Sequence, residues 1–191
     1  MANVYVFRTG SIKHFSTKNI FLGWLNFPLS KDGIKKANII SKKLKSVNFD
    51  YAFCSDQIRG KQALVEVLKN NKKTKVIIDH RLRERNYGVF TGLEKDLIKH
   101  YFEDKFHNIH RHHFSTIPHG ENFSDLEKRI YPFLNELLVF LQSNKESNIL
   151  ICAHTNSMRI IQAFFEDVNQ SNIFKLENSP IEYKKYKLNL G

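Results

Sequence analysis

The chain has 191 residues, a length that suits one domain and is enough to bury a hydrophobic core. Lysine and arginine outnumber aspartate and glutamate by 30 to 19, so the formal net charge is +11 and anionic partners are favoured over cationic ones. No apolar run approaches the roughly 18 residues of a membrane-spanning helix, and no signal-peptide pattern is present. We therefore expect a single cytoplasmic domain over residues 1–191 with no membrane contact.

The two cysteines lie in apolar runs of strand type. Cys54 occurs in YAFCS and Cys152 in ILICAH, where a free cysteine behaves as a small buried hydrophobic residue. Neither belongs to a C-x-x-C pair of the kind found in metal sites. We expect both thiols to be buried and reduced, as in a reducing compartment.

The first half of the chain alternates between short apolar runs and helical patterns. Strands are predicted at residues 4–7 and 51–54. Ser30 is a good N-cap for the helical segment KDGIKKANIISKKLKS, and a second helix is predicted from Gln57 to about Asn70. The apolar face of the first helix is predicted to contain Ile34, Ala37, Ile39, Ile40 and Leu44.

The second half continues this alternation, with strands predicted at residues 76–78 and 149–153. The long helical segment at 123–145 contains Pro132, which should kink the helix or mark a local start. A last helix is expected just after His154, and residues 181–188 alternate like an edge strand. This order of elements predicts an α/β fold with a largely parallel sheet.

Polar residues follow each of the four predicted strands, where open α/β sheets bind their ligands. They are Arg8 and Thr9, Ser55 and Arg59, Arg83 and Glu84, and His154 and Asn156. Guanidinium groups neutralise phosphoryl oxygens, while an imidazole or a carboxyl group handles a proton. Each residue alone has an ordinary structural explanation, so the prediction of a phosphoryl site rests on their joint placement.

Six motifs occur in an order and at spacings that resemble a known family. They are FRTGS, FLGWLNFPLSKDG, CSDQIRG, RLRERNYGVFTGLEK, HGENFSDLEKRI and ICAHTNSMR. The chain resembles the histidine phosphatase superfamily, and within it the cofactor-dependent phosphoglycerate mutases and their shorter relatives. The resemblance implies a three-layer α/β sandwich that transfers a phosphoryl group on a small phosphorylated metabolite without metal. It implies that no cofactor is required, unless the protein is mutase-like, in which case 2,3-bisphosphoglycerate would be the cofactor. It is also compatible with a homodimer.

The resemblance also assigns roles to individual residues. The family's first motif is Arg-His-Gly, whose histidine forms a phosphohistidine, and the matching position here is Thr9 between Arg8 and Gly10. Arg59 matches the second phosphate-binding arginine and Glu84 the general acid/base. His154 matches the second histidine, which contacts the transferred phosphoryl group.

Further matches concern substrate positioning. The residues that position phosphoglycerate or contact phosphate in the mutases match Asn19, Tyr87, Lys95, Arg111 and Thr155. Thr155 stands where the family has a glycine, and His112 stands where the mutases have a second arginine. The loop after the first motif, which includes Trp24, is one residue longer here than in the family. Either Ser11 or Ser16 could therefore be the residue of this loop that contacts phosphate. The mutase insertion before HGEN is missing, which favours a phosphatase.

Thr9 decides what chemistry this pocket can perform. A threonine hydroxyl is a weak nucleophile that needs an adjacent base, and a threonine phosphate would be a poor donor for a second transfer. Three interpretations stay open: an active enzyme with another nucleophile such as His14 or water, a phosphate-binding pseudoenzyme, and an engineered or divergent change in an otherwise active family.

The sequence offers two weaker alternatives. His107, His110 and His113 are spaced to share a helical face, but no carboxylate or cysteine reinforces a metal site and none is assigned. Nucleic acid is not expected as a partner, because most phenylalanines fall at core-like positions and are not interleaved with basic residues.

Overall fold

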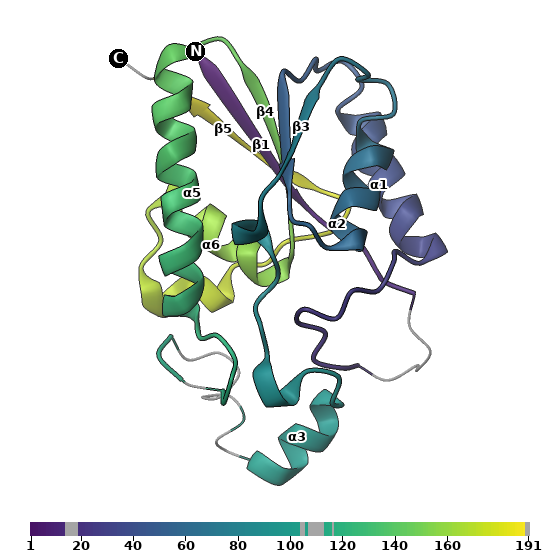
Figure 1. Cartoon of the computed structure of the whole chain (residues 1–191), viewed down its shortest axis with the longest axis vertical. Coiled ribbons are helices and arrows are strands. Elements are labelled where there is room, and N and C mark those ends of the chain that lie inside the picture. The colour runs from purple at the N-terminus through teal and green to yellow at the C-terminus, as the bar shows by residue number, and fades with distance from the viewer. Residues whose placement is uncertain (14–18, 104–105, 107–112, 116, 190–191) are drawn as a thin grey trace.

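The computed structural model describes residues 1–13, 19–103, 106, 113–115 and 117–189, and its centre is a five-stranded sheet (Figure 1). The strands are β1 (Ala2–Arg8), β2 (Tyr51–Cys54), β3 (Lys75–Ile78), β4 (Asn148–Ala153) and β5 (Tyr183–Leu188). Their order in the sheet is β3-β2-β4-β1-β5, in which only β5 runs antiparallel to its neighbour. The predicted α/β fold with a largely parallel sheet is confirmed.

Helices cover both faces of the sheet and so complete three layers. They are α1 (Lys31–Lys43), α2 (Ile58–Val67), α3 (Lys95–Phe102), α5 (Phe123–Ser143) and α6 (Thr155–Glu166), with short 3-10 turns at His80–Leu82, Gly88–Phe90 and Gln170–Lys175. Helices α1 and α2 lie on one face and α5 and α6 on the other, while α3 lies beyond the carboxyl ends of the parallel strands (Figure 1). None of these helices has the length and apolarity needed to cross a membrane in the part of the chain described.

The alternation of strand side chains builds a core on each side of the sheet. Val4 and Val6 join the cluster under α5 and α6, whereas Tyr5 and Phe7 join the cluster under α1 and α2. Because both faces are covered, β1 is apolar along nearly its whole length. Cys54 and Cys152 are both free and fully buried, as predicted.

Helix α1 begins as the sequence predicts but buries a different stripe. The Ser30 side chain accepts a hydrogen bond from the Gly33 N–H and caps the helix. The predicted burial of Ile34 and Ile39 is wrong, since they are 43% and 38% exposed. The buried stripe contains Gly33, Ala37, Ile40, Ser41 and Leu44. At 100° per residue, Ile34 lies beside that stripe, whereas Ile39 lies toward the opposite, outer face of the helix.

Helix α5 runs through its proline without interruption. An Asn122–Asp125 capping box opens the helix, so the prediction that Pro132 marks a local start is wrong. Pro132 removes one backbone donor, but the helix buries Leu126, Ile130 and Leu134 completely against the sheet. Packing of this apolar face outweighs the proline's local cost.

The two edge strands of the sheet, β5 and β3, differ in how their burial compares with the sequence pattern. β5 is an edge strand with alternating burial, as predicted. β3 forms the other edge, and its apolar residues Val76, Ile77 and Ile78 are exposed although the sequence pattern is that of a buried strand.

Candidate active site

A cavity of about 340 Å³ opens at the carboxyl ends of the parallel strands. β1 delivers Arg8 and Thr9 to its wall, α2 delivers Arg59, and the end of β4 delivers His154. Its remaining lining residues are Gly10, Ser11, Ile12, Asn19, Ile20, Leu22, Glu84, Lys95 and Thr155. Residues from six separate stretches of the chain therefore meet at one site.

The two arginines at this site are held by neutral groups. Arg8 Nε donates to Asn178 O at 2.5 Å and Nη1 to Thr155 Oγ1 at 3.3 Å. Arg59 donates to the carbonyls of Leu25 at 2.6 Å and Gly23 at 2.9 Å. Burial lowers the pKa of both guanidinium groups, and the charge of Glu84 acts in the opposite direction. The site thus holds concentrated positive charge that an anion would relieve.

His154 lies between two hydroxyl groups. Its Nε2 is 2.7 Å from Ser55 Oγ and its Nδ1 is 3.4 Å from Thr9 Oγ1. His154 and Ser55 are fully buried and Thr9 nearly so. Burial, followed by the charges of Arg59 and Arg129, lowers the pKa of His154 well below its usual 6.5. The imidazole is therefore neutral near pH 7 and can exchange a proton with a hydroxyl.

The Glu84 carboxylate is fixed by donors that lie mainly on Oε1, with the Asn156 N–H also 3.4 Å from Oε2. Oε1 accepts hydrogen bonds from the Arg85 N–H at 2.7 Å, and from the Asn156 N–H and side-chain Nδ2, both at 3.1 Å. The Glu84 N–H donates to Gln57 Oε1 at 3.0 Å. Its carboxylate is thereby held at the cavity wall, in a position to exchange a proton with a bound group.

A second cavity of about 420 Å³ adjoins the first, with Asn19, Glu84, Lys95 and Thr155 among the residues common to both. Its own wall includes Tyr87, Asp96, Lys99, Phe106, Asn156 and Arg159. Burial, with a smaller contribution from the nearby Glu84 charge, raises the pKa of Tyr87 to about 12. This outer cavity is lined by more cationic than acidic side chains, which suits a second negative group on a ligand.

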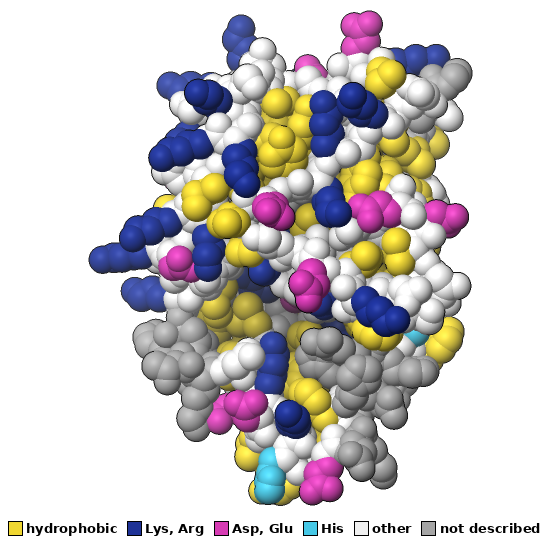
Figure 2. Space-filling model, turned by 180° about the vertical axis from the view of Figure 1, so that it is seen from behind, with side chains coloured by type: hydrophobic (Ala, Val, Ile, Leu, Met, Phe, Trp, Pro, Cys, Tyr) yellow, Lys and Arg dark blue, Asp and Glu magenta, His cyan; other side chains and the backbone are white. Residues whose placement is uncertain are grey.

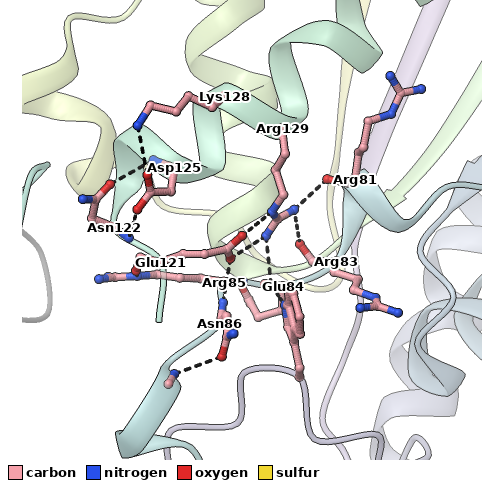
Figure 3. Close-up of polar contacts among 12 residues, drawn as sticks. Arg81, Arg83, Glu84, Arg85, Asn86, Glu121, Asn122, Asp125, Lys128 and Arg129 are labelled. Atoms are coloured by element: carbon pink, nitrogen blue, oxygen red, sulfur yellow. Dashed lines mark hydrogen bonds and ion pairs between the residues drawn. The ribbon is translucent and has the colours of Figure 1, made fainter. Parts of the chain in front are cut away.

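Behind the site, Arg129 of α5 holds the segment that carries Glu84 (Figure 3). Arg129 donates to the carbonyls of Arg81, Arg83 and Glu84 at 2.6, 3.0 and 3.0 Å. It also pairs with both carboxylate oxygens of Glu121, at 2.6 and 2.9 Å, and Glu121 Oε2 accepts from the Asn86 N–H at 2.8 Å. This pair fixes the backbone around Glu84 although neither side chain lines the cavity.

The structure brings together most of the residues singled out in the sequence. Arg8, Thr9, Asn19, Arg59, Glu84, Lys95, His154 and Thr155 line the inner cavity, and Tyr87 lines the outer one. Ser11 also lines the inner cavity, where its hydroxyl donates to Asp32 at 2.8 Å. Arg111, Ser16 and His14 lie outside the described residues.

Other candidates are placed elsewhere. Arg83 forms an ion pair with Asp56 and lies over the Trp24 ring at 4.8 Å, so it does not join the cavity. Trp24 Nε1 donates to Glu84 O at 2.7 Å. His113 lies 3.2 Å from Glu127, while its proposed partners His107 and His110 fall outside the described residues. No cluster of three metal-ligating side chains occurs among the residues described.

Sequence reasoning missed Lys99, Arg159 and Arg129. Arg159 could have been found, because it lies one helical turn after Thr155 on α6 and so shares its face. Lys99 has the same relation to Lys95 on α3. Arg129 gives no local signal, since its role depends on where α5 packs.

The basic excess seen in the composition extends well beyond the site. Lysine and arginine side chains are most dense on the side of the molecule where α1 lies, with fewer acidic side chains among them (Figure 2). Such a field favours the approach of anions to the whole surface.

Comparison with known proteins places the chain in a family. The model of the histidine phosphatase superfamily (branch 1) matches residues 4–189. A 2,3-bisphosphoglycerate-dependent phosphoglycerate mutase of Methanococcus vannielii is 34% identical over 206 residues, covering 93% of this chain and 86% of the relative. The mutase of the same name from Allorhizobium ampelinum is 30% identical, covering 92% and 85%.

Solved structures of histidine phosphatase superfamily members have the same fold as this chain. An alpha-ribazole phosphatase from Shigella flexneri has a TM-score of 0.83 at 21% identity, over 98% of this chain and 91% of its own. A mycobacterial glucosyl-3-phosphoglycerate phosphatase has a TM-score of 0.82 at 20% identity, over 96% and 88%. Together with the family match, these findings show that the chain belongs to the histidine phosphatase superfamily.

Proposed function

We propose that the protein binds a small phosphorylated metabolite at the inner cavity, and that its phosphoryl-transfer activity is impaired because Thr9 occupies the nucleophile position. One observation carries this proposal. Arg8 and Arg59 face one cavity with their charges desolvated, and Glu84 is the only carboxylate on its described wall. A phosphate dianion supplies the charge that this arrangement lacks.

The helix that starts at the cavity adds to the same preference. α6 begins at Thr155, directly after His154, and its positive end faces the cavity. Thr155 supplies a hydroxyl that already accepts from Arg8. An anion bound here would meet guanidinium donors on one side and the helix N-terminus on the other.

The impairment follows from the chemistry of the hydroxyl group. Imidazole attacks phosphorus as a neutral group and later leaves readily, whereas a threonine alkoxide is a poor leaving group. A mutase cycle needs both steps. In this proposal 2,3-bisphosphoglycerate is therefore a ligand of the site that does not sustain repeated phosphoryl transfer, although the related mutases are named for their dependence on it.

A phosphomonoesterase is the second candidate. It is favoured by the short connection between Arg111 and the HGEN motif, because a less covered pocket admits water more readily. In a phosphatase, water takes the place of the second phosphate acceptor of a mutase.

Two measurements test the proposal. Calorimetric titration with 2,3-bisphosphoglycerate should show binding that weakens on Arg8→Met and not on Arg81→Met, which removes an equal charge away from the cavity. Thr9→His should raise phosphatase or mutase turnover by about 100-fold or more, the scale of a correctly placed catalytic group. Absence of binding refutes the site. Retained binding without a gain in Thr9→His refutes the claim that Thr9 limits the activity.

A further inference from the structure

Three side chains from the ends of three strands form a hydroxyl, imidazole and hydroxyl array at the floor of the inner cavity. Ser55 follows β2, His154 follows β4 and Thr9 follows β1. Ser55 Oγ is 2.7 Å from His154 Nε2, and Thr9 Oγ1 is 3.4 Å from His154 Nδ1. Thr9 and His154 line the cavity, so the far end of the array is open to a ligand.

We propose that Thr9 is a phosphoryl acceptor: a bound phosphomonoester transfers its phosphoryl group to the Thr9 hydroxyl, with His154 as the base, and the adduct accumulates. This inference rests on the proposed function, because the donor must first occupy the inner cavity. It adds a covalent site that turns over once and then stops.

The array gives His154 the arrangement of a general base. In the tautomer that carries its proton on Nε2, the imidazole donates to Ser55 Oγ and leaves the lone pair of Nδ1 toward Thr9. Ser55 Oγ also accepts a hydrogen bond from the Gln57 N–H at 3.3 Å, which fixes its place. The 3.4 Å contact is long for a hydrogen bond, and contacts of this kind tighten in a substrate complex.

Charge supports the same direction of proton transfer once a ligand is present. Burial and the charge of Arg59 oppose a protonated His154 and lower its pKa. A phosphate dianion held by Arg8 and Arg59 would offset that repulsion and stabilise the imidazolium. The base therefore gains strength when the phosphoryl donor arrives.

The step balances without any further reactant. A bond forms between Thr9 Oγ1 and phosphorus while the bond from phosphorus to the leaving oxygen breaks, and the hydroxyl proton passes to His154 Nδ1. An aryl oxide leaves without a proton. An alkoxide takes one from solvent, or from Glu84 when that carboxyl is protonated.

The reaction then stops because of the ester that it forms. The phosphorus of a threonine phosphate can be attacked by water only if an alkoxide leaves, whereas a phosphoimidazole releases a far better leaving group. Thr9 is 6% exposed, so water reaches the adduct through the ligand cavity. Accumulation of the adduct is expected in place of steady turnover.

The test uses p-nitrophenyl phosphate as the donor with the full chain. We expect a burst of nitrophenolate of about one equivalent per protein, a mass gain of one phosphoryl group, and its location at Thr9 by peptide fragmentation. Thr9→Val should abolish the burst while inorganic phosphate still binds. Ser55→Ala should slow the burst by about 10-fold or more, because it leaves the imidazole without its second partner.

Ser41→Ala is the matched control, since Ser41 is also a buried serine but its hydroxyl donates to Val67 O in the layer of α1 and α2. It should leave the burst unchanged. The inference is overturned if a protein that binds inorganic phosphate gives no adduct, if the adduct lies on another residue, or if Thr9→Val keeps the burst. Failure to bind phosphate at all would instead refute the proposed function.

Discussion

Replacing Arg129 by methionine should destabilise the protein far more than replacing its neighbour on the same helix. Arg129 donates five hydrogen bonds, three to the backbone carbonyls of Arg81, Arg83 and Glu84 and two to the Glu121 carboxylate. Methionine keeps much of the apolar stem and removes every donor. The carbonyls and the carboxylate are then left without their partner.

The size of the effect follows from partial burial. Breaking one side of a buried charged pair costs about 3–5 kcal/mol, and a hydrogen bond to a charged group contributes about 1.5–3 kcal/mol. Arg129 and Glu121 are each 16% exposed, so water reaches part of the pair and reduces the cost. We expect a loss of about 3 kcal/mol in the free energy of unfolding, toward the low end of that range.

Urea unfolding at equilibrium measures this loss, with Lys128→Met as the control. Lys128 is 73% exposed and its ion pair with Asp125 at 3.1 Å lies at the surface, where such pairs are worth about 1 kcal/mol or less. Arg129→Lys should recover little, because an ammonium group cannot span both oxygens of Glu121 and three carbonyls. If Arg129→Met costs under about 1 kcal/mol, the account of how Glu84 is positioned is wrong.

Three further predictions concern the same site and its supports. Gly33→Ala should lower stability by about 1–3 kcal/mol in thermal unfolding, because the added carbon would lie 2.1 Å from Ser11 O; a melting temperature equal to wild type would contradict this. His154 has a lowered folded pKa, so the unfolded state binds the extra proton and stability should fall as pH drops below about 6.5, by at most about 1.4 kcal/mol per pH unit. His154→Gln should flatten that slope in urea titrations at several pH values, and equal slopes would argue against a buried neutral imidazole. Burial raises the pKa of Cys54 to about 12 and that of Cys152 as well, so neither thiol should react with a disulfide reagent at pH 8 until urea is added; rapid labelling of the native protein would show that they are accessible.

Local patterns predicted much of this fold because strand and helix signals agree with the final packing. The strand at residues 149–153 is buried in the centre of the sheet, and Ser30 caps its helix through the expected bond to Gly33. The predictions of buried residues were wrong where contacts between distant parts of the chain determine which face of a helix is buried. Ile34 looked like a core residue, but the close approach of Gly33 to Ser11 turns the helix so that Ile34 lies on its flank.

The residues of the site also fall into those that local sequence predicts and those that depend on long-range packing. Residues directly after strands, such as Thr9 and His154, could be found because parallel strands deliver their carboxyl ends to one edge. The support from Arg129 could not, because its partners lie 45–48 residues away for the three carbonyls and depend on the docking of α5. The contact of Thr9 with His154 spans 145 residues and likewise appears only in three dimensions.

A crystal structure of the protein soaked with inorganic phosphate tests most directly whether the inner cavity binds a phosphate ion. The account predicts one tetrahedral ion in the inner cavity, with its oxygens in contact with Arg8, Arg59 and His154 and close to the Thr9 hydroxyl. An inner cavity that stays without the ion at a concentration that saturates binding in solution, or an ion bound only at the lysine-rich surface, would contradict it.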